Sequence, residues 1–298
     1  MNRPHRQKTL FFLAYRRLIL PAAIVMLFGS CATGSASRHQ DTIPGKNPLD
    51  ATDPITMVVP PMGKNEADSA LRFQALADYL EARTGYRYRV RTSHNFLFHW
   101  TSVRVASSRE IAIDAAHFSD YRLTKLGNRL LAKETGSSSL ALITRSTDNT
   151  PLHKFAGKPV AVRDIPSLDA TRLHAMLPDP ARQPRIYPIS DYQDGLELLD
   201  QDKVAALMLP TSLASDLLEI SQGYRILAIT EPVAARAITA SRDLDPVIFR
   251  QVQRALLFAA DSSAGRFALE QAGLNQLIAG DASDYDGYRE LLASYWGY

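Results

Sequence analysis

Residues 157–177, GKPVAVRDIPSLDATRLHAML, place a short apolar strand pattern directly before a helical pattern. The strand is expected at 158–162 and the helix at 167–177, where apolar residues recur every three or four positions. The same pairing continues, with strands at 185–189, 204–209 and 224–229 and helices at 192–200 and 212–220. Alternating strands and helices predict an α/β fold with a mostly parallel sheet.

A similar series precedes this one. Strands are expected at 55–59, 86–92, 111–115, 130–133 and 140–144, and helices at 68–84, 98–107 and 119–126. After a run at 235–240 the chain ends in helices expected at 246–259, 265–272 and 285–296. Because helix-rich C-terminal sequence most simply completes the first series, we expect two lobes. Lobe one takes 54–145 and 233–298, lobe two takes 146–232, and the chain crosses near 144–146 and 230–233.

The N-terminus has the organisation of an export signal. Five basic residues and no acidic one precede an apolar run at 18–28, which leads through Gly29 and Ser30 to the chain's only cysteine, Cys31. A basic segment, a short apolar segment and a small-residue cleavage site are typical of a signal peptide, here 1–30, and the apolar run is too short to span a bilayer. Residues 31–53 are polar and rich in Ser, Thr, Gly and Pro, which predicts a flexible tether.

The tetrad Phe28-Gly29-Ser30-Cys31 resembles the bacterial lipobox, although Phe28 replaces the usual leucine. The resemblance implies acylation of Cys31 and a lipid bilayer as a partner; an incidental cysteine behind an ordinary signal peptide is the alternative. Three acyl chains would hold the protein stably on a membrane. Ala32 in place of aspartate resembles an outer-membrane address. Arg16-Arg17 also suggests a twin-arginine signal, but the preceding Tyr15 is atypical and favours the general secretory route.

The net charge of the chain without its leader argues against nucleic acid as a partner. The full chain has 34 basic and 31 acidic residues, and removal of the leader's five basic residues leaves 29, a net charge of about −2. This disfavours nucleic-acid binding. With Cys31 acylated no disulfide is available, so the fold depends on its hydrophobic core.

Several short motifs follow one another across the domain: Phe73-x-x-Leu76-x-x-Tyr79-Leu80-Glu81-x-x-Thr84-Gly85, Ala156-Gly157-Lys158-x-Val160-Ala161-Val162, Asp164-x-x-Ser167, Gly195-x-x-x-Leu199, Val204-Ala205-Ala206 and Glu231-Pro232. In their order and spacing they resemble one known family, the periplasmic solute-binding proteins of phosphate, phosphite and phosphonate ABC transporters. The resemblance implies a two-lobed type II periplasmic binding protein, each lobe a mostly parallel sheet flanked by helices. It also implies a small ligand held in the cleft by clamshell closure, and an ABC permease as partner.

The resemblance places part of the ligand site at the start of the helix at 167–177. There the family holds a phosphonate with hydroxyls and backbone N–H groups at the positive end of the helix dipole. Here Ser167 keeps one hydroxyl, but Asp169 puts a carboxylate where the oxyanion is expected. Capping of the helix alone is the alternative for both residues. Asp191 or Tyr192 stands where the family often has a histidine, so the ligand chemistry has changed.

In lobe one, the loops at strand ends offer further ligand-binding candidates: Met62, Asn95, Phe96, His117, Phe118 and Tyr121. The aromatic residues could form a wall for an organic ligand, or they could simply belong to the core. His117 could donate or accept a hydrogen bond in the cleft, or could be a satisfied, partly buried histidine.

The sequence has no P-loop, dinucleotide fingerprint, nucleophile elbow or zincin helix, so no cofactor and no enzyme activity are expected. His94 and His99 lack partners at metal-ligand spacing, so no metal site is expected. Two functions remain. One is a solute-binding lipoprotein that passes a small polar or anionic ligand to an ABC transporter. The other is a sensor or protein-interaction module built on the same fold, which Ala32 slightly favours.

Overall fold

The computed structural model describes residues 53–105 and 107–293 of the chain. The predicted signal peptide, Cys31 and nearly all of the predicted tether lie outside these residues. Within the described part, no helix is long and apolar enough to cross a membrane.

The first sheet has six strands in the order β13-β4-β12-β3-β1-β2. Strands β1 to β4 run in one direction, while β12 and β13 run in the opposite direction. The bounds are β1 Ile55–Val58, β2 Tyr88–Arg91, β3 Glu110–Asp114, β4 Arg129–Glu134, β12 Ala237–Ala240 and β13 Leu277–Ile278.

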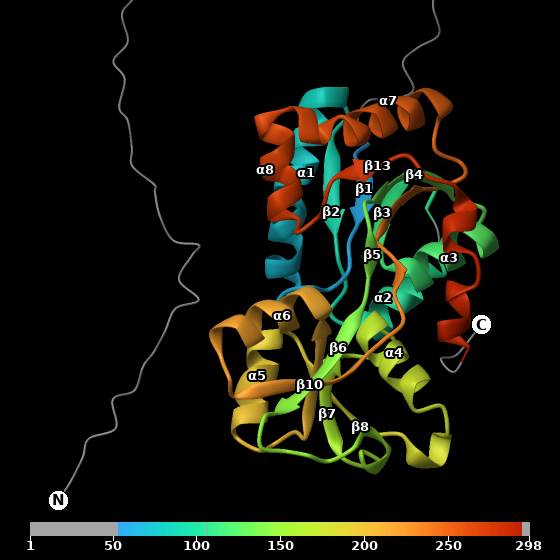
Figure 1. Cartoon of the computed structure of the whole chain (residues 1–298). Helices are drawn as coiled ribbons and strands as arrows, with labels where there is room; N and C mark the ends of the chain where they lie inside the picture. Colours follow the sequence, from blue (N-terminus) through green and yellow to red (C-terminus); the bar gives the residue numbers. More distant parts are fainter. Residues whose placement is uncertain (1–52, 106, 294–298) are drawn as a thin grey trace, which may run out of the picture. The chain divides into compact units, whose positions relative to one another are not determined.

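Helices cover both faces of this sheet (Figure 1). The helices are α1 (Glu66–Thr84), α2 (Phe96–Val103), α3 (Ala116–Lys125), α7 (Pro246–Leu257) and α8 (Ser263–Gln271). Helix α1 begins where the Asn65 side chain accepts a hydrogen bond from the Asp68 N–H, and it ends at Gly85, whose φ of 75° is easy only for glycine.

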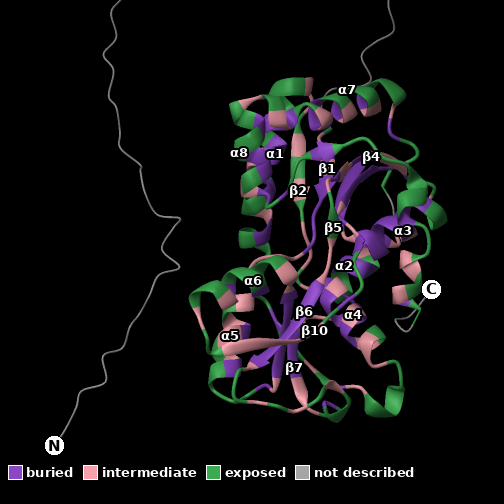
Figure 2. Cartoon of the chain, viewed as in Figure 1, coloured by how far each residue is buried: buried purple, intermediate pink, exposed green. Residues whose placement is uncertain are grey.

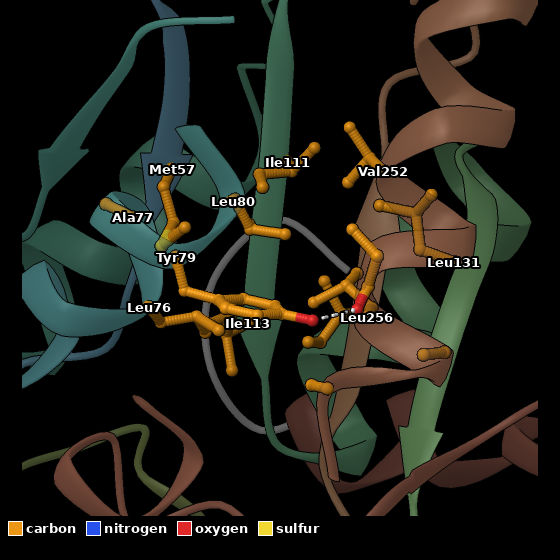
Figure 3. Close-up of a cluster of buried hydrophobic side chains, with 14 of the residues drawn as sticks. Met57, Leu76, Ala77, Tyr79, Leu80, Ile111, Ile113, Leu131, Val252 and Leu256 are labelled. Atoms are coloured by element: carbon orange, nitrogen blue, oxygen red, sulfur yellow. Dashed lines mark hydrogen bonds between the residues drawn. The ribbon is translucent and has the colours of Figure 1, made fainter. Parts of the chain in front are cut away.

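The largest hydrophobic cluster joins α1, α7 and α8 to β1, β3, β4 and β12. Figure 3 shows its centre, where the ring of Tyr79 lies among aliphatic side chains and its hydroxyl donates a hydrogen bond of 3.0 Å to the Ala255 carbonyl. The two parts of lobe one, from before and after lobe two in sequence, therefore share one core.

The second sheet has five strands in the order β10-β6-β9-β7-β8. Four of them share one direction and β6 runs opposite, between β9 and β10. The strands are β6 Leu140–Arg145, β7 Pro159–Arg163, β8 Arg185–Ile189, β9 Ala206–Pro210 and β10 Tyr224–Ile229; the helices are α4 Leu168–Met176, α5 Tyr192–Asp200 and α6 Thr211–Ile220. One cluster packs this sheet against α5 and α6 and another packs it against α4. The central strands are buried and the outward helix faces are exposed (Figure 2).

The boundary between lobe one and lobe two lies earlier in the chain than the sequence predicted. Residues 140–145, placed in lobe one from the sequence, form β6 and belong to the second sheet. The first crossing between the sheets therefore lies near β5 (Ser137–Ser138), not at 144–146, and the return crossing lies near β11 (Val233–Ala234). Strands β5 and β11 pair with each other, so the two crossings form a two-stranded antiparallel ribbon.

The helix expected at 285–296 is also wrong in its described part. Residues up to 293 form two 3₁₀ segments, Ala282–Tyr285 and Tyr288–Leu292, separated by Gly287 with φ of 90°. That backbone conformation interrupts an α-helix. Tyr285 is fully buried and donates a hydrogen bond to the Ala235 carbonyl, which fixes this segment against the crossing.

Candidate ligand site

Three side chains of lobe two meet at the carboxyl ends of β7 and β8. The Tyr192 hydroxyl donates a hydrogen bond of 2.8 Å to Asp169 Oδ2, and Arg163 Nε lies 4.0 Å from the same oxygen. The Arg163 guanidinium also lies over the Tyr192 ring, 4.4 Å from its centroid, a cation–π arrangement. Asp169 and Tyr192, selected separately from the sequence, are therefore direct partners.

Burial sets the electrostatics of this group. Asp169 is only 4% exposed, and desolvation raises the pKa of its carboxyl, although Arg163 and the Tyr192 hydroxyl favour the ionised form. Desolvation also raises the pKa of the Tyr192 hydroxyl well above 10, so Tyr192 remains a hydrogen-bond donor. The Asp169 carboxyl is therefore buried, with the Arg163 guanidinium as its nearest positive group.

Ser167 and Asp191 act as helix caps. Ser167 Oγ accepts from the Ala170 N–H at 3.2 Å and donates to the Arg163 carbonyl at 2.9 Å. Asp191 accepts from the Gln193 N–H at 2.8 Å at the start of α5. These contacts fix the first turns of α4 and α5, and for Ser167 they support the capping interpretation.

His117 joins the two sheets. It follows β3, and its Nε2 lies 2.9 Å from the Pro166 carbonyl oxygen, beside Ser167 at the start of α4. Since a carbonyl only accepts, Nε2 carries the proton, and the buried Nδ1 has no hydrogen-bond partner among the described residues. Burial lowers the pKa of His117 to about 4, against the opposing effects of the Pro166 carbonyl and Asp114.

The other lobe-one candidates divide into core and cap. Phe96, Phe118 and Tyr121 pack with Trp100 and Leu292 in a separate hydrophobic cluster, which supports the core interpretation. Asn95 accepts a hydrogen bond from the Phe98 N–H and caps α2. Met62 is partly buried against the main core of lobe one. Among the described residues, no hydrogen bond or ion pair joins these five residues to Asp169 or Tyr192.

One charged residue of the site and one ion pair between the lobes were missed from the sequence. Arg163 ends β7 and is recognisable in retrospect as a charged residue at a strand's carboxyl end. Lys64 Nζ lies 3.8 Å from Asp194 Oδ1, an exposed ion pair that links the loop before α1 to α5. Only the fold brings Lys64 and Asp194 together, because they are far apart in sequence. Among the described residues no cluster of three or more His, Cys, Asp or Glu side chains is placed to hold a metal ion.

The histidine gives a pH prediction. His117 binds a proton near pH 6.5 when unfolded but only near pH 4 when folded, so the unfolded state binds more protons as the pH falls between these values. We expect this group alone to remove about 2 kcal/mol of stability between pH 6.5 and 5. Urea unfolding at both pH values should show that the free energy of unfolding falls less between pH 6.5 and 5 for His117→Gln than for the wild type. The matched control, His94→Gln at an exposed position, should keep the wild-type loss, and an equal loss in all three proteins would contradict the assignment.

Two α/β lobes, which the chain joins through the β5–β11 ribbon, with polar side chains at strand ends, are the architecture of the class of periplasmic binding proteins. The chain matches the family model described as "ABC transporter, phosphonate, periplasmic substrate-binding protein" over residues 62–285, and it belongs to that family. It is thus a solute-binding component with a periplasmic location and an ABC permease as the partner that the family implies. No curated protein sequence matches the chain.

Solved structures share the fold at low sequence identity. PhnD1 from Prochlorococcus marinus, in complex with methylphosphonate, has 11% identity and a TM-score of 0.67, covering 81% of this chain and 98% of that one. A binding-protein component of an ABC phosphonate transporter from Pseudomonas aeruginosa has 10% identity and a TM-score of 0.65, with 80% and 85% covered. XAC2383 from Xanthomonas citri, bound to ATP, has 14% identity and a TM-score of 0.63, with 80% and 96% covered. These likenesses confirm the expected fold, and the family assignment favours solute binding over the sensor or interaction module.

Proposed function

We propose that this protein is a membrane-anchored lipoprotein that holds a small polar solute between its two lobes and presents it to an ABC permease without changing it chemically. One observation supports this position for the solute. The His117–Pro166 hydrogen bond brings the end of β3 beside the start of α4, where Ser167, Asp169 and Tyr192 gather. Ligands of open α/β sheets bind at the carboxyl ends of the strands.

Isothermal titration with the mature domain, residues 54–298, tests the binding role. The panel contains methylphosphonate, phosphate, phosphite, amino acids and amines. We expect at least one solute to bind with micromolar or tighter affinity and to raise the melting temperature, since a ligand that binds only the folded state stabilises it. A panel that binds nothing, while a protein partner copurifies, would instead favour the interaction module.

Cys31 is the proposed anchor. The change Cys31→Ser removes the only thiol in the chain, so we expect the acylated form to disappear and the protein to leave the membrane fraction. Fractionation and intact-mass measurement of the exported protein check this, with Ser37→Ala in the same segment as the control. Membrane-bound, lipid-modified Cys31→Ser protein would overturn the anchor. Ala32 favours the outer membrane as its site.

A further inference from the structure

Helix α2 has an apolar outer face that the other described residues leave exposed. Its inner residues pack into lobe one and are buried. On the outer side, Leu97 and Phe98 are 37% and 59% exposed, and Val105, just beyond the last turn, is 71% exposed. Phe98 and Val105 lie on one side, because they are seven positions apart and the backbone stays helical through Arg104. A helix that is apolar on all sides is normally covered on all sides, so this face lacks a cover.

The chain around α2 is strongly basic. Residues 82–109 contain six arginines and no aspartate or glutamate, although the chain without its leader carries a net charge of about −2. At the end of α2 the Arg104 guanidinium lies over the Trp100 ring, 5.4 Å from its centroid. Positive charge is therefore concentrated on the part of lobe one that carries the exposed apolar face.

Arginines of the edge strand β2 lie on the same side of the sheet as α2. Arg91 Nη2 lies 2.8 Å from Glu110 Oε2 on β3, and Asp114, on the same face of β3, contacts His99 of α2 at 2.7 Å. Arg89 is exposed and two residues before Arg91, so its side chain leaves the same face of β2. The outer face of α2 is thus flanked by guanidinium groups from two elements.

This combination fits the headgroup region of an anionic bilayer. Aromatic and aliphatic side chains enter the boundary of the acyl chains there, while arginines bind lipid phosphates. Helix α6 provides a contrast within the same chain. It also exposes Leu213 and Ile220, but its exposed residues include Asp216 and Glu219, which an anionic surface would repel.

The length of the chain before β1 permits such a contact. At about 3.5 Å per residue, the stretch from Cys31 to Asp53 spans at most about 75 Å. That reach exceeds the diameter of a domain of this size, so a bilayer that holds Cys31 is within reach of α2.

We propose that the outer face of α2, with Arg89 and Arg104 beside it, is a docking surface for an anionic phospholipid bilayer. The contact is reversible, and the Cys31 anchor proposed above would strengthen it by raising the local concentration of the surface. It would turn lobe one towards the membrane. The inference goes beyond solute binding and requires neither a bound solute nor the anchor.

Vesicle binding by a protein without its lipid tests the surface directly. The mature chain from residue 31 onward, carrying Cys31→Ser, is sedimented with vesicles of mixed phosphatidylglycerol and phosphatidylcholine, and with vesicles of phosphatidylcholine alone. We expect binding to the mixed vesicles that weakens as salt is added, and much weaker binding to phosphatidylcholine. Adding Phe98→Gln or Arg89→Gln should each lower the affinity for the mixed vesicles by about fivefold or more.

Two changes in lobe two are the matched controls. Leu213 is the third residue of α6, as Phe98 is of α2, and it is 44% exposed. Arg185 is exposed on β8, the edge strand of the second sheet. Leu213→Gln and Arg185→Gln should leave vesicle binding unchanged, and circular dichroism should show that all variants keep the fold.

Three results would overturn the proposal. They are a parent protein that binds no vesicles, equal binding to both kinds of vesicle, and equal binding by the parent and the Phe98→Gln variant. Permease captured through this face, by a protein that ignores vesicles, would also overturn it in favour of a protein partner. The calorimetric panel decides solute binding separately, so a protein that binds a solute but no vesicle contradicts this inference alone.

Discussion

Replacing Arg122 with leucine should lower the free energy of unfolding by about 3–5 kcal/mol. Arg122 of α3 is fully buried; its Nη1 lies 2.7 Å from Glu110 Oε1 and its Nε lies 2.8 Å from Asp114 Oδ2. The change leaves two buried carboxylates with too little positive charge. His99 would still contact Asp114 at 2.7 Å, and Arg91 would still contact Glu110 at 2.8 Å, but neither replaces the lost guanidinium between the two carboxylates.

Urea unfolding at pH 7 measures this effect. The matched control is Arg182→Leu, because Arg182 forms an ion pair with Asp179 in which both side chains are more than half exposed. Exposed ion pairs contribute little, so the control should change stability by less than about 1 kcal/mol. A similar small change for Arg122→Leu would show that the buried network is not paired as the structure has it.

The second large effect is expected in the hydrophobic core. The change Phe73→Ala should cost about 3–5 kcal/mol, since it removes a fully buried ring from the cluster between α1, α7 and α8 and leaves a cavity. Chemical unfolding of both proteins, followed with the same probe and fitted with the same slope of free energy against denaturant concentration, would give the difference in the free energy of unfolding directly.

Leu71 on the same helix provides the control. It is 73% exposed, so Leu71→Ala removes an apolar side chain from α1 without opening a cavity. We expect a change within about 0.5 kcal/mol. If Leu71→Ala were as destabilising as Phe73→Ala, the assignment of the buried face of α1 would be wrong.

Periodicity predicted most of the fold because it is local. The spacing of Phe73, Leu76 and Leu80 and the stop at Gly85 identified α1, which begins two residues before its predicted start. Strand β3 was predicted to within one residue at each end. The membership of β6 was not predictable in this way, because its apolar run fits the core of either lobe and only the pairing with β9 and β10 decides between them.

The site was predicted less completely, for a related reason. Asp169 and Tyr192 were selected through the family resemblance, but their hydrogen bond depends on the positions of α4 and α5. The charged network of lobe one was missed altogether. In β3, alternation points Ile111 and Ile113 towards α1 and sends Glu110 and Asp114 to the opposite face, where α2 and α3 supply His99 and Arg122. Alternation locates such carboxylates, but it does not identify their partners.

The reversed strand β12 has a consequence for synthesis. It lies between β3 and β4, and β4 pairs with no strand made before it, so a nascent chain cannot join β4 to this sheet until residue 240 has been made, and the edge strand β13 follows only at residue 278. The strands of the second sheet, in contrast, all lie between residues 140 and 229. The first sheet therefore stays incomplete until nearly the whole chain has been made, well after the second sheet has all of its strands.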